Sequence, residues 1–190
     1  MIARDPFQVR LSGSGGQGVI LASVLLAEAG MHDGLQVVQT QSYGPAARLG
    51  AAKSEVVLSH HQIAFPEVSL PDAVVCLSQD AYRKYGGQVA EGGLRIVESD
   101  VAAGLPAAPA GTILLPITST ARDLGPDGVI TANVVALGAL VALSAVVSVE
   151  GARRALRERV KPETLELNQR AFEAGLRLGA GTAAIASAPP

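Results

Sequence analysis

The sequence predicts a single α/β domain in which helices cover both faces of a doubly wound sheet. Three observations lead to this fold class. Short apolar runs recur along the 190 residues, longer helix-like segments separate several of them, and glycines or prolines stand between the two kinds of segment. Alternation of strands and helices favours a sheet covered on both sides. A chain of this length can build one domain with a sizeable core.

Six strands are expected, each a short run of mainly apolar residues. They are Val9–Ser12, Leu35–Thr40, Val56–Leu58, Ala73–Leu77, Leu94–Val97 and Thr112–Leu115. The first run is followed by a glycine-rich turn and by the apolar segment Val19–Met31, which is the pattern of strand, loop and helix. A shorter helix is expected at Gln79–Tyr85. The predicted architecture is a three-layer, Rossmann-like doubly wound sheet.

Residues 131–149 form an apolar stretch of nearly membrane-spanning length. Asn133 near its start, Gly138 within it and the lack of a flanking basic cluster favour a buried or interface helix over a membrane helix. Gly138, Ala142 and Ala145 stand at helical spacing, and their small size would allow another helix to approach closely. We therefore expect no membrane association.

Extra helices are expected at the C-terminal end. Glu150–Val160 and Glu163–Leu178 have amphipathic patterns, and Pro162 between them is well tolerated at a helix start. Residues 179–190 are small and of low complexity. We expect the domain to span residues 1–178 and residues 179–190 to form a disordered tail.

Composition and charge exclude some classes of partner. The formal net charge is -2 and no run of basic residues occurs, so nothing indicates binding to nucleic acid or to an anionic membrane. Hydrophobic residues make up 48% of the chain and charged residues only 17%, below the usual share of about 25%. This composition implies an apolar surface with few charges. Such a surface predicts a permanent partner chain and, for the isolated chain, a homodimer. Residues Met1–Val9 contain no apolar signal segment, which indicates a cytoplasmic protein.

Cys76 is the only cysteine. A disulfide within the chain and a [4Fe–4S] cluster held by four of its own thiolates are both excluded. Because Cys76 lies in an apolar run, we expect it to be a small buried core residue. The three histidines lack the spacing of a metal site, and no Ser–His–Asp order is present. We therefore expect neither catalytic residues nor a metal site on this chain.

The glycine-rich loop, Gly13 to Gly18, fits the pattern G-x-G-x-x-G between the first strand and the first helix. Its candidate cofactor-binding residues are Gly13, Gly15, Gly16, Gln17 and Gly18. Glycines here permit a tight turn and allow a phosphate to approach the helix N-terminus. A dinucleotide site also needs an acidic residue at the end of the second strand, where none is present; Asp33 precedes that strand. In the structural alternative, the glycines only let the helix pack tightly on the sheet.

A second group of candidates follows the second strand. It contains Tyr43, Gly44, Pro45 and Arg48. Ligands gather at the carboxyl ends of strands in open α/β sheets. Tyr43 and Arg48 offer a hydrogen-bonding ring and a fixed cation, which suit a phosphate or a carboxylate. The alternative is a turn shaped by Gly44-Pro45 that carries a surface arginine.

Four stretches of the chain together resemble the gamma subunits of 2-oxoacid:ferredoxin oxidoreductases, most closely those of the 2-oxoglutarate type. They are Gly13–Glu28, Val37–Val57, Asn133–Leu140 and Thr164–Gly175. The most specific is the second, with Gln39-Thr40-Gln41-Ser42-Tyr43-Gly44-Pro45 followed by Lys53-Ser54-Glu55-Val56. The sequence departs from the family in having Arg48-Leu49-Gly50 where Arg-Gly-Gly is usual, and Ala46 where an acidic residue is common.

The resemblance implies a division of labour between chains. Complexes of this family oxidatively decarboxylate a 2-oxoacid with coenzyme A and give an acyl-CoA, carbon dioxide and reduced ferredoxin. Thiamine diphosphate, Mg and [4Fe–4S] clusters are then expected on partner alpha, beta and ferredoxin-like subunits. This chain is expected to be a non-catalytic gamma subunit without a cofactor of its own, apart from a coenzyme A contact. The resemblance adds Asn133 to the candidate contact residues.

Several alternatives remain open at this point. The glycine-rich loop and Tyr43–Arg48 can face a coenzyme A channel or the interface with the alpha and beta chains. The chain can instead be a stand-alone nucleotide- or CoA-binding module. It can also belong to an indolepyruvate or branched-chain 2-oxoacid oxidoreductase, although Gln39-Thr40-Gln41-Ser42 favours the 2-oxoglutarate type.

Overall fold

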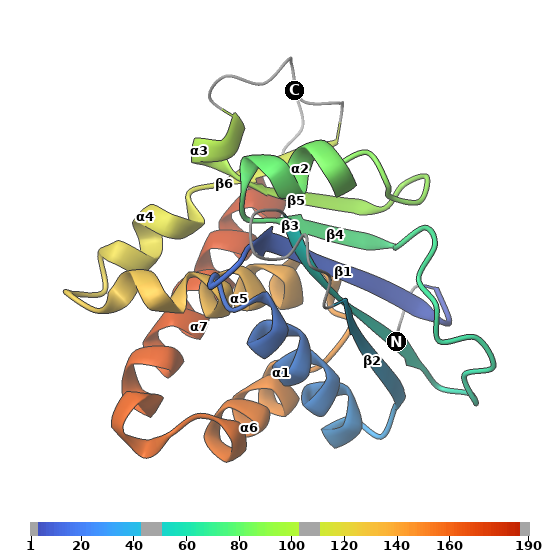
Figure 1. The fold of residues 1–190 in the computed structure, drawn as a ribbon. Helices are drawn as coiled ribbons and strands as arrows, with labels where there is room; N and C mark the ends of the chain where they lie inside the picture. The colour runs from blue at the N-terminus through green and yellow to red at the C-terminus, as the bar shows by residue number, and fades with distance from the viewer. Residues whose placement is uncertain (1–3, 43–50, 103–110, 187–190) are drawn as a thin grey trace.

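The computed structural model describes residues 4–42, 51–102 and 111–186. Its six strands form one sheet in the order β2-β3-β1-β4-β5-β6 (Figure 1). The strands are β1 (Phe7–Ser14), β2 (Gln36–Ser42), β3 (Ala51–Ser59), β4 (Ala73–Cys76), β5 (Leu94–Glu98) and β6 (Thr112–Leu115). All six predicted runs are strands, and the predicted α/β fold class is confirmed.

The sheet is mixed. Strands β1, β4, β5 and β6 run parallel to one another, whereas β3 is antiparallel to both of its neighbours, β1 and β2. Strand β2 therefore runs in the same direction as β1, and the two strands end at the same edge. There Ser14 pairs with Ala51 and Ser42 pairs with Lys53.

Helices cover both faces of this sheet (Figure 1). One face carries α1 (Val19–His32), α5 (Ala132–Ser144), α6 (Val149–Arg159) and α7 (Pro162–Ala186), and the other carries the shorter α2 (Gln79–Tyr85) and α3 (Ser99–Ala102). After β6 the chain forms α4 (Ile117–Arg122) and the short 3-10 helix η2 (Gly128–Thr131) before it enters α5. Helix α1 follows β1 and α2 follows β4, so two adjacent parallel strands send their helices to opposite faces.

Strand β1 shows how the sequence assigns side chains to the two faces. Val9 and Leu11 belong to the large core under α1 and α5, whereas Arg10 and Ser12 alternate with them and lie on the α2 side. This is the two-residue period of a strand. The next strand, β4, is buried along its whole length, as expected for a central parallel strand with helices on both sides.

Helix α5 is buried by the rest of the chain. Every residue from Asn133 to Val141 is buried, and α7 packs along it. The glycine of α5, Gly138, lies against the backbone of α7, so the predicted close approach of a second helix is confirmed there. The helix ends at Ser144 because Ala145 adopts a left-handed conformation with φ of 49°, which breaks the apolar stretch before residue 149. Within the ranges that the structure describes, no helix is both long enough and apolar enough to cross a membrane.

Helix α7 is longer than predicted. We expected residues 179–190 to form a disordered tail, but the helix continues to Ala186. The reason is packing, since Gly179 lies against the backbone of Ala139 in α5. Residues 187–190 lie outside the described ranges.

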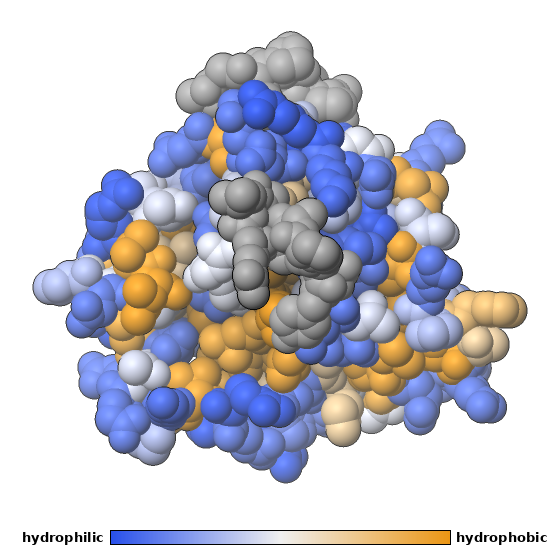
Figure 2. All heavy atoms as spheres, in the orientation of Figure 1, coloured by the Kyte–Doolittle hydropathy of each residue, from blue (hydrophilic) through white to orange (hydrophobic). Residues whose placement is uncertain are grey.

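Apolar side chains also reach the surface around the start of α1 and the connection from α4 to α5 (Figure 2). Val129 and Ile130, just before α5, are 45% and 67% exposed, and Leu21 on α1 is 37% exposed. We call these three residues the apolar patch. The exposed apolar surface of this region therefore belongs to η2 and α1 and not to α5 itself.

Candidate functional site

The glycine-rich loop connects β1 to α1 and is closed by one of its own side chains. The Oε1 atom of Gln17 accepts a hydrogen bond from the Ser14 backbone N–H at 2.6 Å, and its Nε2 atom donates to the Leu77 carbonyl oxygen at 3.1 Å. The first contact closes the loop upon itself. The second ties the loop to the residue that follows β4. Ser14, Gly15 and Gly16 stay exposed on the outside of the loop.

Two glycines of the loop are required by packing inside the chain. A Cβ atom on Gly13 would lie 2.6 Å from Oε1 of Gln17 and 3.3 Å from Cβ of Leu77. Gly18, the residue that precedes α1, has φ of 70°, and a Cβ atom there would lie 2.6 Å from Nδ2 of Asn133. A left-handed conformation and close contacts of this kind both select glycine.

Asn133 lies beside the loop. It is 3% exposed, and its Nδ2 atom donates to the Gly18 carbonyl oxygen at 3.0 Å across 115 positions of sequence. The structure therefore brings Asn133 together with the glycine-rich loop.

The loop lies at the point in the sheet where ligands of open α/β folds usually bind. Neighbouring strands β1 and β4 are parallel, and their helices α1 and α2 leave to opposite faces. A crevice forms outside the carboxyl ends of such strands. Leu77 continues the pairing at this point, because its N–H donates to the Ser12 carbonyl at 2.9 Å.

The other predicted contact residues, Tyr43, Gly44, Pro45 and Arg48, lie outside the described residues. The chain reaches this segment through Ser42, the last residue of β2. Ser42 and Ser14 lie at the same edge of the sheet, two strands apart.

A shallow pocket of about 260 Å³ opens beside the loop between α1, η2, α5 and the α6–α7 junction. Asn133 forms part of its wall, and Leu21 and Ile130 of the apolar patch contribute apolar surface. Arg159 and Lys161 supply the positive charge, but the guanidinium of Arg159 is already paired with the carboxylate of Glu28. The pocket therefore offers two asparagine amides, those of Asn133 and Asn168, together with two threonines, one lysine and apolar side chains.

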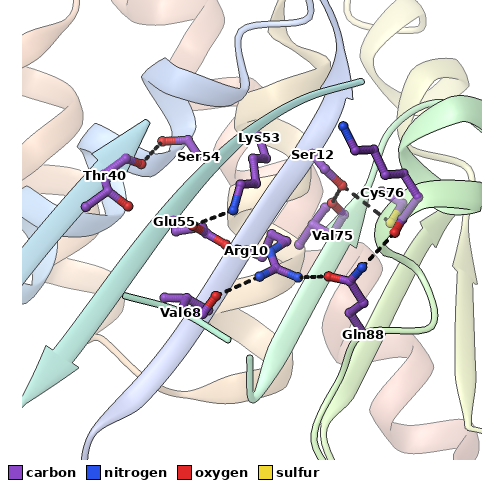
Figure 3. Close-up of polar contacts among 11 residues, drawn as sticks. Arg10, Ser12, Thr40, Lys53, Ser54, Glu55, Val68, Val75, Cys76 and Gln88 are labelled. Carbon is purple, nitrogen blue, oxygen red and sulfur yellow. Dashed lines mark hydrogen bonds and ion pairs between the residues drawn. The ribbon is translucent and has the colours of Figure 1, made fainter. Parts of the chain in front are cut away.

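On the α2 face, a buried ion pair joins the neighbouring strands β1 and β3 (Figure 3). The Nε atom of Arg10 donates to Glu55 at 2.6 Å, and its remaining nitrogens donate to Gln88 Oε1 and to the Val68 carbonyl. The side chains of Arg10 and Glu55 are 3% and 8% exposed. Lys53, the partner of Ser42 in the sheet, also pairs with Glu55 at 2.9 Å. The sequence analysis missed this cluster, although Arg10 between two apolar residues of a strand was a signal for it.

Gln39, part of the most specific family stretch, has an internal role. Its Nε2 atom donates to Ser54 Oγ at 2.8 Å and to Ser23 Oγ at 3.1 Å. Both serines are fully buried, one on β3 and the other on α1. Gln39 therefore joins the second strand to the first helix through a buried polar network.

Asp33 is also engaged within the chain. Its carboxylate accepts hydrogen bonds from the backbone N–H of Ser148 at 2.5 Å and from the Ser148 hydroxyl at 2.6 Å. Ser148 in turn caps the N-terminus of α6. Asp33 thus links α1 to α6, at the end of α1 opposite the glycine-rich loop, and does not supply the ribose contact of a dinucleotide site.

Cys76 is buried, as predicted. Burial raises the pKa of its thiol to about 11, which outweighs the opposite effect of the Ser12 hydroxyl at 3.5 Å. In residues 4–42, 51–102 and 111–186, no group of three His, Cys, Asp or Glu side chains is placed to hold a metal ion.

Comparison with known proteins gives consistent similarities over nearly the whole chain. The family model described as pyruvate ferredoxin/flavodoxin oxidoreductase matches residues 8–178. The 2-oxoglutarate synthase subunit KorC of Methanocaldococcus jannaschii is 44% identical over 171 residues, which is 88% of this chain and 91% of that protein.

Two solved structures extend the comparison to the fold. The gamma subunit of keto/oxoacid ferredoxin oxidoreductase from Geobacter sulfurreducens is 45% identical with a TM-score of 0.81, and the match covers 92% of this chain and 99% of that one. The 2-oxoglutarate:ferredoxin oxidoreductase of Magnetococcus marinus, solved with 2-oxoglutarate, coenzyme A and succinyl-CoA bound, has a TM-score of 0.82 at 23% identity. That match covers 94% of this chain and 32% of the other and shows a shared fold.

Proposed function

This chain belongs to the pyruvate ferredoxin/flavodoxin oxidoreductase family as a gamma-type subunit, and from that membership we propose that it serves a 2-oxoglutarate:ferredoxin oxidoreductase. The observation that carries the choice of substrate is the 44% identity to a 2-oxoglutarate synthase subunit over nearly the full length of both chains. The complex would convert 2-oxoglutarate and coenzyme A to succinyl-CoA and carbon dioxide, with the two electrons passed to ferredoxin.

The proposed role of this chain is non-catalytic. Thiamine diphosphate, Mg and the [4Fe–4S] clusters would be held by alpha, beta and ferredoxin-like partner chains. Support comes from the side chains of the described residues. The single thiol is buried with a raised pKa, and its position leaves it without access to a substrate. Among the buried carboxylates of the described residues, Glu55 and Asp72 are engaged in ion pairs, and Glu98 accepts hydrogen bonds from the backbone N–H and the hydroxyl of Thr118.

We further propose that the sheet edge with the glycine-rich loop, Asn133 and the Tyr43–Arg48 segment faces the catalytic core of the complex. This edge lies at the β1/β4 crevice, where α/β proteins gather ligands and partners. Within it, Arg48 is the residue proposed to contact coenzyme A, because a guanidinium suits a phosphate. The alternative is that this edge packs against the alpha and beta chains and does not contact coenzyme A.

The first experiment is a pull-down of the tagged chain from its native cells, followed by mass spectrometry and an assay of viologen reduction. Thiamine-binding and cluster-binding chains that co-purify with 2-oxoglutarate-dependent activity support the proposal. Activity with indolepyruvate or a branched-chain 2-oxoacid, but not with 2-oxoglutarate, would keep the subunit role and replace the substrate. Recovery of the chain alone would instead favour a stand-alone CoA- or nucleotide-binding module.

The coenzyme A contact has its own test in the assembled complex. Arg48→Ala should raise the KM for coenzyme A and leave the KM for the 2-oxoacid near its original value. Arg83→Ala is the matched control, because Arg83 is exposed on α2 and pairs only with Asp80 at 3.6 Å among the described residues. An unchanged KM for coenzyme A in Arg48→Ala would leave the interface alternative.

A further inference from the structure

The side chain of Gln17 occupies the place in the sheet where an α/β protein would hold a ligand. It crosses from the β1–α1 loop to the residue after β4, with one hydrogen bond at each end. We infer that Gln17 is a built-in ligand of the glycine-rich loop. Its carboxamide accepts a backbone hydrogen bond that a bound phosphate would otherwise accept. The loop is therefore closed by its own side chain and is not a phosphate-binding site.

The hydrogen bonds of the loop support this assignment. A phosphate in a glycine-rich loop accepts hydrogen bonds from backbone N–H groups. In this chain the Ser14 N–H already has an acceptor in Gln17 Oε1 at 2.6 Å, and the Gln17 N–H donates to the Ser14 carbonyl at 3.2 Å. Because Gln17 Nε2 also binds Leu77, moving the side chain out of the crevice would break two side-chain hydrogen bonds at once.

The glycines give independent support. In a dinucleotide-binding turn the glycines make room for the phosphate and for the helix that starts there. Here α1 begins only at Val19, after the motif. The space next to Gly13 is filled by the Gln17 side chain, and the space next to Gly18 is filled by Asn133. Internal packing therefore accounts for the first and last glycines of the motif.

This inference rests on the interaction edge proposed above and says which part of that edge is accessible. It does not depend on which 2-oxoacid the complex uses. Coenzyme A or a partner chain at this edge meets the exposed outer surface of the loop, Ser14 to Gly16, while the crevice behind it stays closed by Gln17. Gln17 is then a positioning residue that fixes the loop against the end of β4.

The first test uses the unmodified full chain and solution NMR. The side-chain amide protons of Gln17 should exchange with solvent more slowly than those of Gln36, an exposed glutamine on β2, by about tenfold, as expected for a hydrogen-bonded group. Millimolar inorganic phosphate should leave the backbone amide signals from Ser14 to Val19 unshifted. Equal exchange of the two glutamine side chains, or phosphate-dependent shifts in the loop, would overturn the inference.

The second test is Gln17→Met, which keeps the approximate volume of the side chain and removes its amide. Exchange of the Ser14 backbone amide should speed up by about tenfold, because its acceptor is lost. Gln36→Met is the matched control and should leave Ser14 exchange unchanged. A Gln17→Met chain in which Ser14 stays as protected as before would contradict the assignment. These readouts need no enzyme activity, so their failure is separate from failure of the proposed function.

Discussion

Gly138 of α5 and Gly175 of α7 face each other across the contact between these helices. A methyl group on Gly138 would overlap the carbonyl oxygen of Phe172, and one on Gly175 would overlap the carbonyl oxygen of Val135. The two helix backbones thus touch directly, with no side chain between them. Close approach of this kind depends on both glycines.

Gly138→Ala should destabilise the chain by roughly 1–3 kcal/mol, as overpacking of a tight core does. For a domain of this size the melting temperature should fall by about 2–4 °C per kcal/mol, which differential scanning calorimetry measures. Gly181→Ala is the control, because Gly181 is exposed on α7, the helix that packs against α5, and a Cβ atom there meets nothing within 4 Å. A Gly138→Ala chain as stable as the parent would show that the helices can move apart without cost.

Glu55→Gln should be strongly destabilising, because it leaves the Arg10 guanidinium buried without its charged partner. Breaking a buried ion pair by removing one partner typically costs about 3–5 kcal/mol. Urea unfolding measures the loss. Asp80→Asn provides the comparison: Asp80 and its partner Arg83 are 62% and 58% exposed, so only a small change is expected. Equal effects of the two substitutions would mean that solvent reaches the Arg10 pair.

Cys76 should resist thiol reagents in the folded chain. With a thiol pKa of about 11, only about one thousandth of the group is thiolate at pH 8, and the thiolate is the reactive form. We expect no labelling by iodoacetamide at pH 8 without denaturant and full labelling in urea, read by mass spectrometry. Rapid labelling of the native chain would show that the α2 face opens in solution.

Ion pairing on α6 should make a small, pH-dependent contribution to stability. A hydrogen bond from Arg157 at 2.8 Å lowers the pKa of Glu150. Because the folded pKa is the lower one, this contribution is present above the unfolded pKa and is lost as the pH falls through the folded pKa. The difference in melting temperature between the parent and Glu150→Gln should therefore be largest near neutral pH and vanish in acid. A difference that grows on acidification would contradict this sign.

The isolated chain should self-associate through the apolar patch. Ile130 and Val129 are well exposed and lie beside the proposed interaction edge, and exposed apolar groups of this kind favour a symmetric dimer. Light scattering should give twice the mass of a single chain for the parent and the mass of a single chain for Ile130→Asp. A parent chain that stays monomeric at high concentration would show that the patch is too small to pair with itself.

Much of the fold could be predicted from the spacing of apolar residues, but the direction of one strand could not. All six strands and the four longest helices were placed from the sequence, but the direction of β3 was not. The predicted third strand, Val56–Leu58, was separated from the predicted end of the second strand at Thr40 by fifteen residues. A connection of that length is long enough for a crossover to a parallel strand. In the structure β3 begins at Ala51, only nine positions after β2 ends at Ser42, and so short a connection permits only an antiparallel neighbour. The missed residues are the first half of the strand, including Lys53 and Glu55. These two residues pair with each other, and Glu55 also pairs with Arg10, 45 positions away in sequence.

The candidate site shows the same limit. Its position between β1 and α1 was predictable, because G-x-G-x-x-G follows a strand. The side chains that fill the loop could not be predicted. They depend on the orientation of Gln17 and on Asn133, which is 115 positions away from Gly18 in sequence. The short α4 and η2 were also missed, because neither is long enough to show a helical period.

The contact between α5 and α7 also bears on how the chain is made. Helix α5 is apolar on all sides, and the helix that covers its outer side is encoded after it, from Pro162 to Ala186. During synthesis α5 therefore leaves the ribosome well before its cover exists. In that interval the growing chain exposes a row of valine, leucine and alanine side chains, the kind of surface that holding chaperones bind and that aggregates when left free. The last helix to be translated is thus the one that completes the core.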